Sequence, residues 1–423
     1  MLRIFFASLF VILGYNEIIA KSKDIVINKV VDLKGDTLTL KLNENLKFIG
    51  NGKIINGTLV GNNSSISAKD EQAIFSNIYI EGKWTCSKSY SSWFEWTDSG
   101  LTNRAILQSL FNLSGDECQG DVYISEGTYP VAIISENSEV ASINSNTKIH
   151  LNGHIVLEPN AFERYAIFAL HDKEKIVIDG KGKIIGDVEH HKGDKGEWGF
   201  GIKLFACNDI CIRDISVEKC WGDCICLGHN KPGGKISPQK IRIDNVTCIA
   251  GRRQGISICA GNNITVNKCK LSDVGSIKST PPSAGIDIEP DSRKEIMKNI
   301  TIQSCQFSGN GKSYGGDLQL CNMNEQCDVL IKKCNFSHSL VIADGVGNLV
   351  VDECVINKLV VYDKAANILI KNSEIRKGPS FHSNVKFKYC KFRQVNTAIA
   401  LLAISLPLVI GGCYILLKNK QIA

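Results

Sequence analysis

The chain has 423 residues, of which 43% are apolar and 22% are charged. It can therefore bury a large core, which excludes a disordered protein or a simple coiled coil. The 49 Lys and Arg residues nearly balance the 43 Asp and Glu residues, and no dense basic stripe with interleaved aromatic residues occurs, so we expect no nucleic-acid partner.

The first 20 residues have the pattern of a signal peptide. Arg3 supplies a short positive start, Ile4 to Leu13 form the apolar stretch, and Ala20 is a plausible cleavage position. The mature chain would then begin near Lys21 and lie outside the cytoplasm. An uncleaved N-terminal anchor is the alternative, because the residues before Ala20 fit the small-residue cleavage rule only loosely.

Residues 24–97 contain short apolar strands separated by Gly and Asn turns, which predicts a β-rich N-terminal cap. Residues 102–113 follow with the helical spacing of Ile106, Leu107 and Leu110, after a Thr cap. Because the open hydrophobic end of a stack of coils needs cover, we expect this helix to lie at the start of such a stack.

A short strand pattern recurs over residues 98–392 at spacings of 19 to 36 residues, as in "ICIRDI" at 210, "IRIDNV" at 241, "ITVNKC" at 264 and "ITIQSC" at 300. A second short strand follows each of these after a turn, as in "CICL" at 224 and "GIDI" at 285. Unequal spacing of one motif is typical of solenoid coils with loop insertions. The sequence therefore predicts an all-β fold, a right-handed parallel β-helix.

Alternation along the second strand of each coil predicts two columns of side chains. The inward column comprises Ile202, Ile225, Ile256, Ile286, Leu318, Leu340 and Leu359. The outward column comprises Lys203, Cys226, Ser257, Asp287, Gln319, Val341 and Val360.

Cysteine recurs at one position of the first strand, at Cys269, Cys305, Cys334 and Cys354, and exchanges there with Ser373 and Val246. That exchange favours a buried ladder of free thiols over disulfides, because free Cys behaves as a small apolar residue.

Residues 397–417 are an uncharged run long enough to cross a bilayer, followed by the short polar tail 418–423. The run predicts a C-terminal transmembrane helix. Together with the N-terminal pattern, it predicts an exported, single-pass membrane protein whose β-helix lies outside the cytoplasm.

Several segments together resemble the pectate-lyase-like superfamily of right-handed parallel β-helix proteins, to which polygalacturonases and phage tailspikes belong. They include "NGTLVGNNSSI", "IYIEGKW", "GDVYISEGTYPV", "WGDCICLG", "RRQGISI" and "AGIDIEPD", and the resemblance covers about residues 40–375. It implies a protein that acts on or binds polysaccharide. The acid set of polygalacturonases is incomplete here, since Asp223 is followed by Cys224 and preceded by Gly222, and Arg253 and Gln254 replace a Gly-His pair.

The candidate catalytic residues are Asp287 and Glu289, which share one face of a strand, with Asp223 and Arg253 on neighbouring coils. Carboxylates on one face could act as general acid and base, and a cation beside them suits a uronic-acid substrate. The candidate substrate-binding residues are Lys203, Arg252, Gln254, Asp317 and Trp221. The structural alternative is a solvated face of stacked charge pairs.

Two functions therefore stay open: glycosidic-bond hydrolysis or β-elimination in a polysaccharide, or a non-catalytic, adhesin-like role in binding glycans. No metal site or cofactor is expected, although outward acids acting as Ca²⁺ ligands in a lyase are a third alternative.

Overall fold

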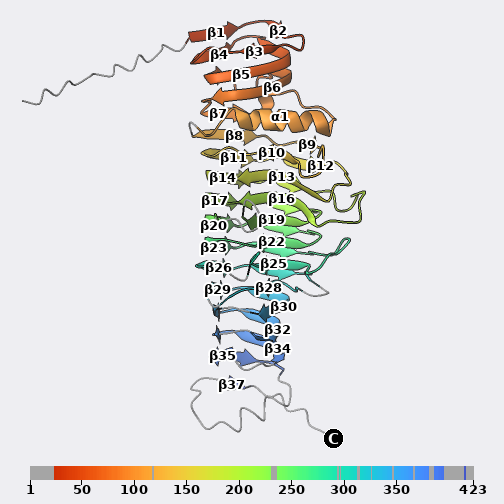
Figure 1. Cartoon of the computed structure of the whole chain (residues 1–423), viewed down its shortest axis with the longest axis vertical. Coiled ribbons are helices and arrows are strands. Elements are labelled where there is room, and N and C mark those ends of the chain that lie inside the picture. The colour runs from red at the N-terminus through yellow and green to blue at the C-terminus, as the bar shows by residue number, and fades with distance from the viewer. Residues whose placement is uncertain are drawn as a thin grey trace, which may run out of the picture.

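The computed structural model describes residues 23–116, 119–229, 236–292, 295, 297–311, 315–324, 326–344, 347–364, 367–380, 385–394 and 414–415. Its strands stack in coils along one long axis, and each named pair of strands is parallel (Figure 1). The predicted parallel β-helix is therefore confirmed.

The N-terminal six strands form a parallel sheet of their own. β5 is its centre: β2 and β3 pair with its first half, β4 pairs with its end and carries β1, and β6 runs along its other edge. Residues 23–84 are thus themselves coils of parallel strands. The strands are β1 (Lys23–Ile27), β2 (Val30–Asp32), β3 (Thr37–Thr39), β4 (Glu44–Phe48), β5 (Lys53–Ser67) and β6 (Phe75–Trp84).

A helix lies across the stack after these coils. Strand β7 (Lys88–Tyr90) and the 3-10 turn η1 (Ser91–Trp93) lead into α1 (Gly100–Asn112), which lies between β6 and the following coils (Figure 1). The helix begins two residues earlier than the sequence predicts. The physical reason is that the Ser99 side chain, and not a Thr hydroxyl, accepts the capping hydrogen bond, from the backbone N–H of Thr102 at 3.4 Å.

The side chains of α1 hydrogen-bond the strands on both sides of it. The backbone N–H of Ile80 in β6 donates to the Ser109 hydroxyl at 3.0 Å, and Asn112 donates to the Ile80 carbonyl at 2.8 Å. On the other side, Gln108 accepts from the Ser142 N–H at 2.8 Å and donates to the Ser142 carbonyl at 3.2 Å. The helix therefore supplies the partners that a neighbouring strand would give.

Each coil after α1 contributes to three ladders of strands. The first is a twelve-stranded sheet of β7, β8 (Gly120–Ile124), β11 (Thr147–Leu151), β14 (Glu174–Gly180), β17 (Asn208–Arg213), β20 (Gln239–Asp244), β23 (Asn262–Asn267), β26 (Ile300–Gln303), β29 (Asp328–Lys332), β31 (Asn348–Asp352), β33 (Ile368–Lys371) and β35 (Val385–Lys388). The second consists of the short strands β9 (Thr128–Val131), β12 (His154–Leu157), β15 (Lys183–Ile185), β18 (Ser216–Glu218), β21 (Thr247–Ile249), β24 (Lys270–Ser272) and β27 (Gln306–Ser308).

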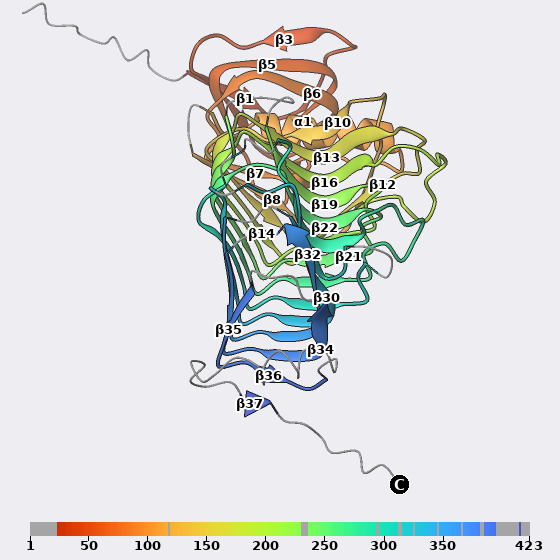
Figure 2. The same ribbon diagram turned by 60° about the horizontal axis from the view of Figure 1, so that its bottom comes forward.

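The third ladder carries the candidate site. It begins with β10 (Glu139–Ser142), β13 (Arg164–His171), β16 (Trp198–Phe205), β19 (Asp223–Gly228), β22 (Gln254–Ile258), β25 (Ala284–Ile288) and β28 (Leu318–Leu320). It continues with the later residues of β30 (Asn335–Asp344), β32 (Val355–Lys364) and β34 (Glu374–Ser380). The first residues of these three strands continue the second ladder, which β36 (Lys391–Phe392) and β37 (Tyr414–Ile415) extend. Figure 2 shows the first and third ladders as two walls of the coils, with the longer loops projecting beside the third.

The register of the third ladder matches both predicted columns. Ile202 pairs with Ile225, and the row continues to Leu359 through residues that are all buried in the core. The second row runs in register from Lys203 to Val360, but its middle is covered: Asp287 is 0% exposed and Ser257 is 1% exposed. A side chain that points away from the core of a coil is therefore not always exposed to solvent in this ladder.

The thiol ladder is confirmed. Cys269, Cys305, Cys334 and Cys354 are all buried and free. Their Sγ atoms donate to backbone carbonyls, for example that of Cys305 to the Gln303 carbonyl at 3.3 Å. These side chains fill the core between coils without cross-linking them.

Within the described ranges, no helix is both long and apolar enough to span a bilayer. The predicted transmembrane run, residues 397–417, lies outside those ranges apart from Tyr414–Ile415 of β37, and the predicted signal peptide also lies outside them.

Candidate functional site

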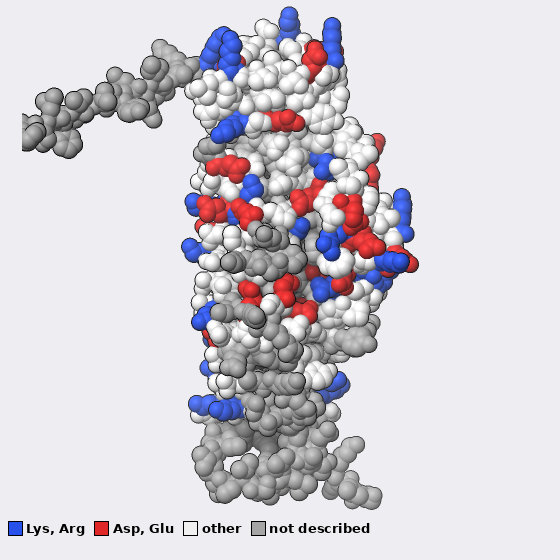
Figure 3. Space-filling view, in the orientation of Figure 1, with Lys and Arg blue, Asp and Glu red and all other residues white. Residues whose placement is uncertain are grey.

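A cavity of about 560 Å³ opens beside the third ladder, where the strands meet the longer loops. Acidic and basic side chains lie interspersed over the middle of the stack on the face shown in Figure 3. The cavity is lined by Asn137, Arg164, Trp198, Phe200, Lys203, Phe205, Asp223, Cys226, Gly228, His229, Arg253, Cys259, Glu289, Pro290, Asp291 and Asn322.

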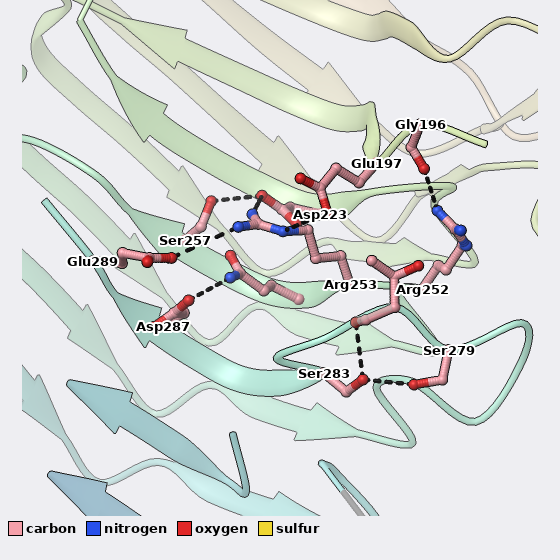
Figure 4. A network of polar contacts seen from close by, with 12 residues as sticks. Gly196, Glu197, Asp223, Arg252, Arg253, Ser257, Ser279, Ser283, Asp287 and Glu289 are labelled. Atoms are coloured by element: carbon pink, nitrogen blue, oxygen red, sulfur yellow. Dashed lines mark hydrogen bonds and ion pairs between the residues drawn. The ribbon is translucent and has the colours of Figure 1, made fainter. Parts of the chain in front are cut away.

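Arg253 lines this cavity, and its guanidinium joins three carboxylates, of which those of Asp223 and Glu289 also belong to the lining (Figure 4). Its NH1 lies 3.4 Å from Asp223 Oδ2, its NH2 lies 3.7 Å from Glu289 Oε2, and its Nε lies 3.5 Å from Glu197 Oε2. These three acids come from three places in the chain. Their shared cation permits carboxylates that would otherwise repel one another to lie on one wall.

Asp223 is the first residue of β19 and is fully buried. Its Oδ2 accepts a hydrogen bond from the Ser257 hydroxyl at 2.7 Å. Its Oδ1 is also buried and has no hydrogen-bond partner in the described part of the chain. Burial raises the pKa of Asp223 to about 6, against the opposing effects of Arg253 and Ser257. Asp223 thus keeps a proton up to about pH 6, where an ordinary Asp has lost it.

Glu289 and Asp287 alternate with Ile288 at the end of β25, but they have different environments. The Glu289 side chain is 34% exposed, lines the cavity and accepts from Asn322 Nδ2 at 3.0 Å. Asp287 lies beneath it, hydrogen-bonded by Gln254 Nε2 and 3.9 Å from Cys321 Sγ. Burial, and then the charge of Glu289, raise the pKa of Asp287 well above its usual range.

No family model matches the chain. The chain is 30% identical over 189 residues to the uncharacterized protein YclG of Bacillus subtilis (strain 168), covering 40% of this chain and 32% of that relative, so it spans about a third of the relative's length.

Two solved structures resemble most of the chain. One is a mutant tailspike of the Escherichia coli bacteriophage HK620 in complex with a pentasaccharide. The TM-score is 0.50, the sequence identity is 11%, and the match covers 72% of this chain and 61% of that chain. The other is a hyperthermoactive exopolygalacturonase from Thermotoga maritima. The TM-score is 0.50, the sequence identity is 12%, and the match covers 72% of this chain and 86% of that chain. The protein is a right-handed parallel β-helix. At these identities the likeness establishes the fold of this β-helix.

The β-helix brings together four of the residues singled out in the sequence. Asp223, Arg253, Glu289 and Lys203 line one cavity. Lys203 Nζ lies 3.6 Å from Glu139 Oε1 at the other end from Glu289. Asp287 and Gln254 lie under the cavity and contact each other, and neither lines it.

Three other predicted site residues lie apart from this network. The Asp317 carboxylate accepts from Asn310 Nδ2 at 3.1 Å and from the backbone N–H of His338 at 2.6 Å, so it fixes a turn further down the stack. Trp221 is buried, and the Arg252 guanidinium lies 3.9 Å from the centre of its ring. Arg252 also donates to the Lys278 carbonyl at 2.8 Å, so this pair packs loops together.

Glu197 is a site residue that the sequence reasoning missed. It lies in the inserted loop directly before β16, as Arg253 lies directly before β22. The strand between them, β19, begins with Asp223, so all three residues lie at the same end of successive strands of one parallel ladder. This position was the signal that could have identified Glu197.

One group of side chains in the described structure could hold a metal ion. Single ligand atoms of Asp287, Glu289 and Cys321 all lie within 4.8 Å of one another. The sequence analysis expected no metal site and kept Ca²⁺ binding by the outward acids only as a third alternative; Cys321 was not among its candidate ligands.

Proposed function

We propose that this β-helix hydrolyses a glycosidic bond of a polysaccharide, with Asp223 as the proton donor and Glu289 as the base. The observation that carries the proposal is that Asp223, a buried residue that lines the cavity, has an Oδ1 with no hydrogen-bond partner among the described residues. An unpaired oxygen on a carboxyl of raised pKa can hand its proton to a leaving sugar oxygen. The likeness of fold to a pentasaccharide-bound tailspike and to an exopolygalacturonase supports polysaccharide as the substrate class.

The mechanism follows from the different environments of the two acids. Asp223, protonated at pH values below about 6, donates to the glycosidic oxygen and becomes a carboxylate. Arg253, 3.4 Å away, stabilises the charge that forms on it. Glu289, half-buried at the mouth of the site, accepts a proton from the attacking water, while Asn322 orients its carboxylate.

The opposite end of the cavity supports an acidic sugar as substrate. Arg164 is exposed there, with its guanidinium 4.3 Å from the centre of the Trp198 ring. Lys203 lies on the same wall, where burial lowers its pKa and the nearby Arg164 adds to that effect. Arg164 beside Trp198 and Lys203 beside Phe205 suit a uronic-acid unit, whose carboxylate pairs with a cation while its ring packs on an aromatic side chain.

A non-catalytic, glycan-binding role is the second candidate, and a specific observation favours it. Asp223 and Glu289 are both already engaged with Arg253, and charge pairs of this kind can serve structure alone. The same cavity would then bind a glycan without cleaving it.

The deciding experiment assays the full chain on acidic and neutral polysaccharides, measuring new reducing ends and unsaturated ends separately. We expect reducing ends without unsaturation, and a fall in rate of about 10²- to 10⁴-fold in both Asp223→Asn and Glu289→Gln. Glu353→Gln, an exposed acid on a distant coil, is the matched control and should keep full activity.

Unsaturated ends would show that the reaction is β-elimination and not hydrolysis. Glycan binding without either product would support the non-catalytic, glycan-binding role. Equal activity of Asp223→Asn and the native chain would remove Asp223 from the chemistry.

We also propose that the β-helix is exported and held at a membrane by its C-terminal run. The support is the signal-like pattern of residues 1–20 and the uncharged run 397–417. A polymer-degrading site is of use where the polymer lies, outside the cytoplasm.

A further inference from the structure

We propose that Asp287, Glu289 and Cys321 form a binding site for a thiophilic divalent cation, with Zn²⁺ as the best match. A carboxylate oxygen from each acid and the Cys321 thiol lie within 4.8 Å of one another beneath the cavity. The inference does not depend on the proposed hydrolysis, because it concerns binding of an ion in the absence of any glycan.

Backbone pairing fixes the positions of the three donors. Asp287 in β25 is in register with Gln319 in β28, so Cys321, two residues further on, lies beside Glu289. The N–H of Cys321 donates to the Ile288 carbonyl at 3.1 Å, between the two acids in the chain. Asp287 therefore lies in β25, and Glu289 and Cys321 directly follow the ends of the two paired strands β25 and β28.

A fourth donor lies next to these three. Gln254 is fully buried, its Nε2 contacts Asp287 Oδ2, and its Oε1 has no hydrogen-bond partner in the described part of the chain. A half-turn of the amide about its last bond exchanges the two atoms and brings Oε1 to Asp287. With a cation present, this exchange would give the buried oxygen the partner that it lacks.

The chemistry of the donors selects the ion. One thiolate and carboxylate or amide oxygens suit Zn²⁺ at four-coordinate distances of about 2.0–2.3 Å, whereas Ca²⁺ and Mg²⁺ prefer oxygen alone. The 4.8 Å spread is wider than such a shell, so the donors must close on the ion. To do so, Glu289 would exchange its contacts with Asn322 and Arg253 for the ion; its side chain is 34% exposed and borders the cavity through which the ion would enter.

Bound metal would occupy the Glu289 oxygens that the proposed base needs. If the β-helix is a hydrolase, micromolar Zn²⁺ would therefore inhibit it, and a chelator would restore its rate. This consequence rests on the proposed function, whereas the binding itself does not.

The test titrates Cd²⁺, a spectroscopic stand-in for Zn²⁺, into the chelator-treated, reduced full chain and follows the thiolate-to-metal absorption in the ultraviolet. We expect one site that Zn²⁺ displaces, whose absorption is lost in Cys321→Ser. Cys259→Ser, which removes another thiol at the cavity, should retain it. Asp287→Asn and Glu289→Gln should weaken the affinity by at least the roughly tenfold change that follows loss of an outer-shell partner.

A thermal melt of each variant separates loss of the site from loss of the fold, and Glu289→Gln, at a partly exposed position, serves if Asp287→Asn does not fold. The proposal is overturned if the native chain shows no such absorption, or if folded Cys321→Ser shows it unchanged. If Cd²⁺ binds but no glycan is cleaved, the proposed hydrolysis is contradicted and the proposed metal site is retained.

Discussion

Asp223 combines complete burial with a single adjacent cation. Arg253 and the Ser257 hydroxyl favour its charged form, whereas burial and the charges of Cys224 and Glu197 disfavour it. Burial has the larger effect, so the pKa rises from its ordinary 3.8 to about 6. The folded protein therefore keeps a proton on Asp223 that the unfolded chain releases.

This proton gives a prediction about stability. A carboxyl whose pKa is raised on folding stabilises the fold less as the pH rises, here between about pH 4 and 6. The shift corresponds to on the order of 3 kcal/mol. Between about pH 4 and 7, the free energy of unfolding of the native chain should fall by about that amount relative to Asp223→Asn, as measured by urea denaturation. Parallel pH dependences for the two proteins would contradict the assignment.

At this scale the sequence could predict neighbours but not their environments. Period and register place Asp223, Arg253 and Glu289 on adjacent coils, and the structure joins them through one guanidinium. The alternation rule also directs Asp287 away from the core, yet Gln254 and Cys321 on the flanking strands cover it. Cover of this kind depends on side chains two coils apart, which a pattern within one strand does not contain.

Helix α1 occupies a position in the stack where a strand would otherwise pair with its neighbours. Its apolar residues Ile106, Leu107 and Leu110 are buried, as their spacing predicts. Its polar residues Gln108, Ser109 and Asn112 were not predicted to have a role, because their bonds are to strands far away in sequence. Apolar periodicity predicts the buried face of an element but not its hydrogen-bond partners.

Removing one of these side chains should weaken the packing of α1 between the N-terminal coils and the coils that follow it. Gln108→Ala takes away the partner of both the N–H and the carbonyl of Ser142, which should lower the free energy of unfolding by about 1 to 3 kcal/mol. Leu101→Ala, at an exposed position of the same helix, should change it by less than about 0.5 kcal/mol. Chemical denaturation of both variants tests this, and equal effects would show that the paired bonds do not stabilise this packing.

The whole molecule is a stack with its described N-terminal and C-terminal coils at opposite ends (Figure 1). If the chain is exported and anchored as proposed, the native protein should sediment with membranes, resist extraction at alkaline pH, and be accessible to protease added outside intact cells. A variant ending at residue 396 should instead be released in soluble form. Recovery of the native chain in the cytosolic fraction would contradict the proposal.

The register of the third ladder also sets a regular spacing for the residues along the cavity. The cavity runs from Arg164 in β13 to Asn322 just after β28, and these strands are five steps apart in the ladder. At about 4.8 Å a step, the lining spans about 24 Å along the axis. A linear polymer lying along the stack would therefore meet a new coil at a fixed interval. Insertion of one whole coil would lengthen the cavity by one interval while leaving every other residue in register. If the cavity binds a polymer as proposed, the number of coils would set the length of polymer that it contacts.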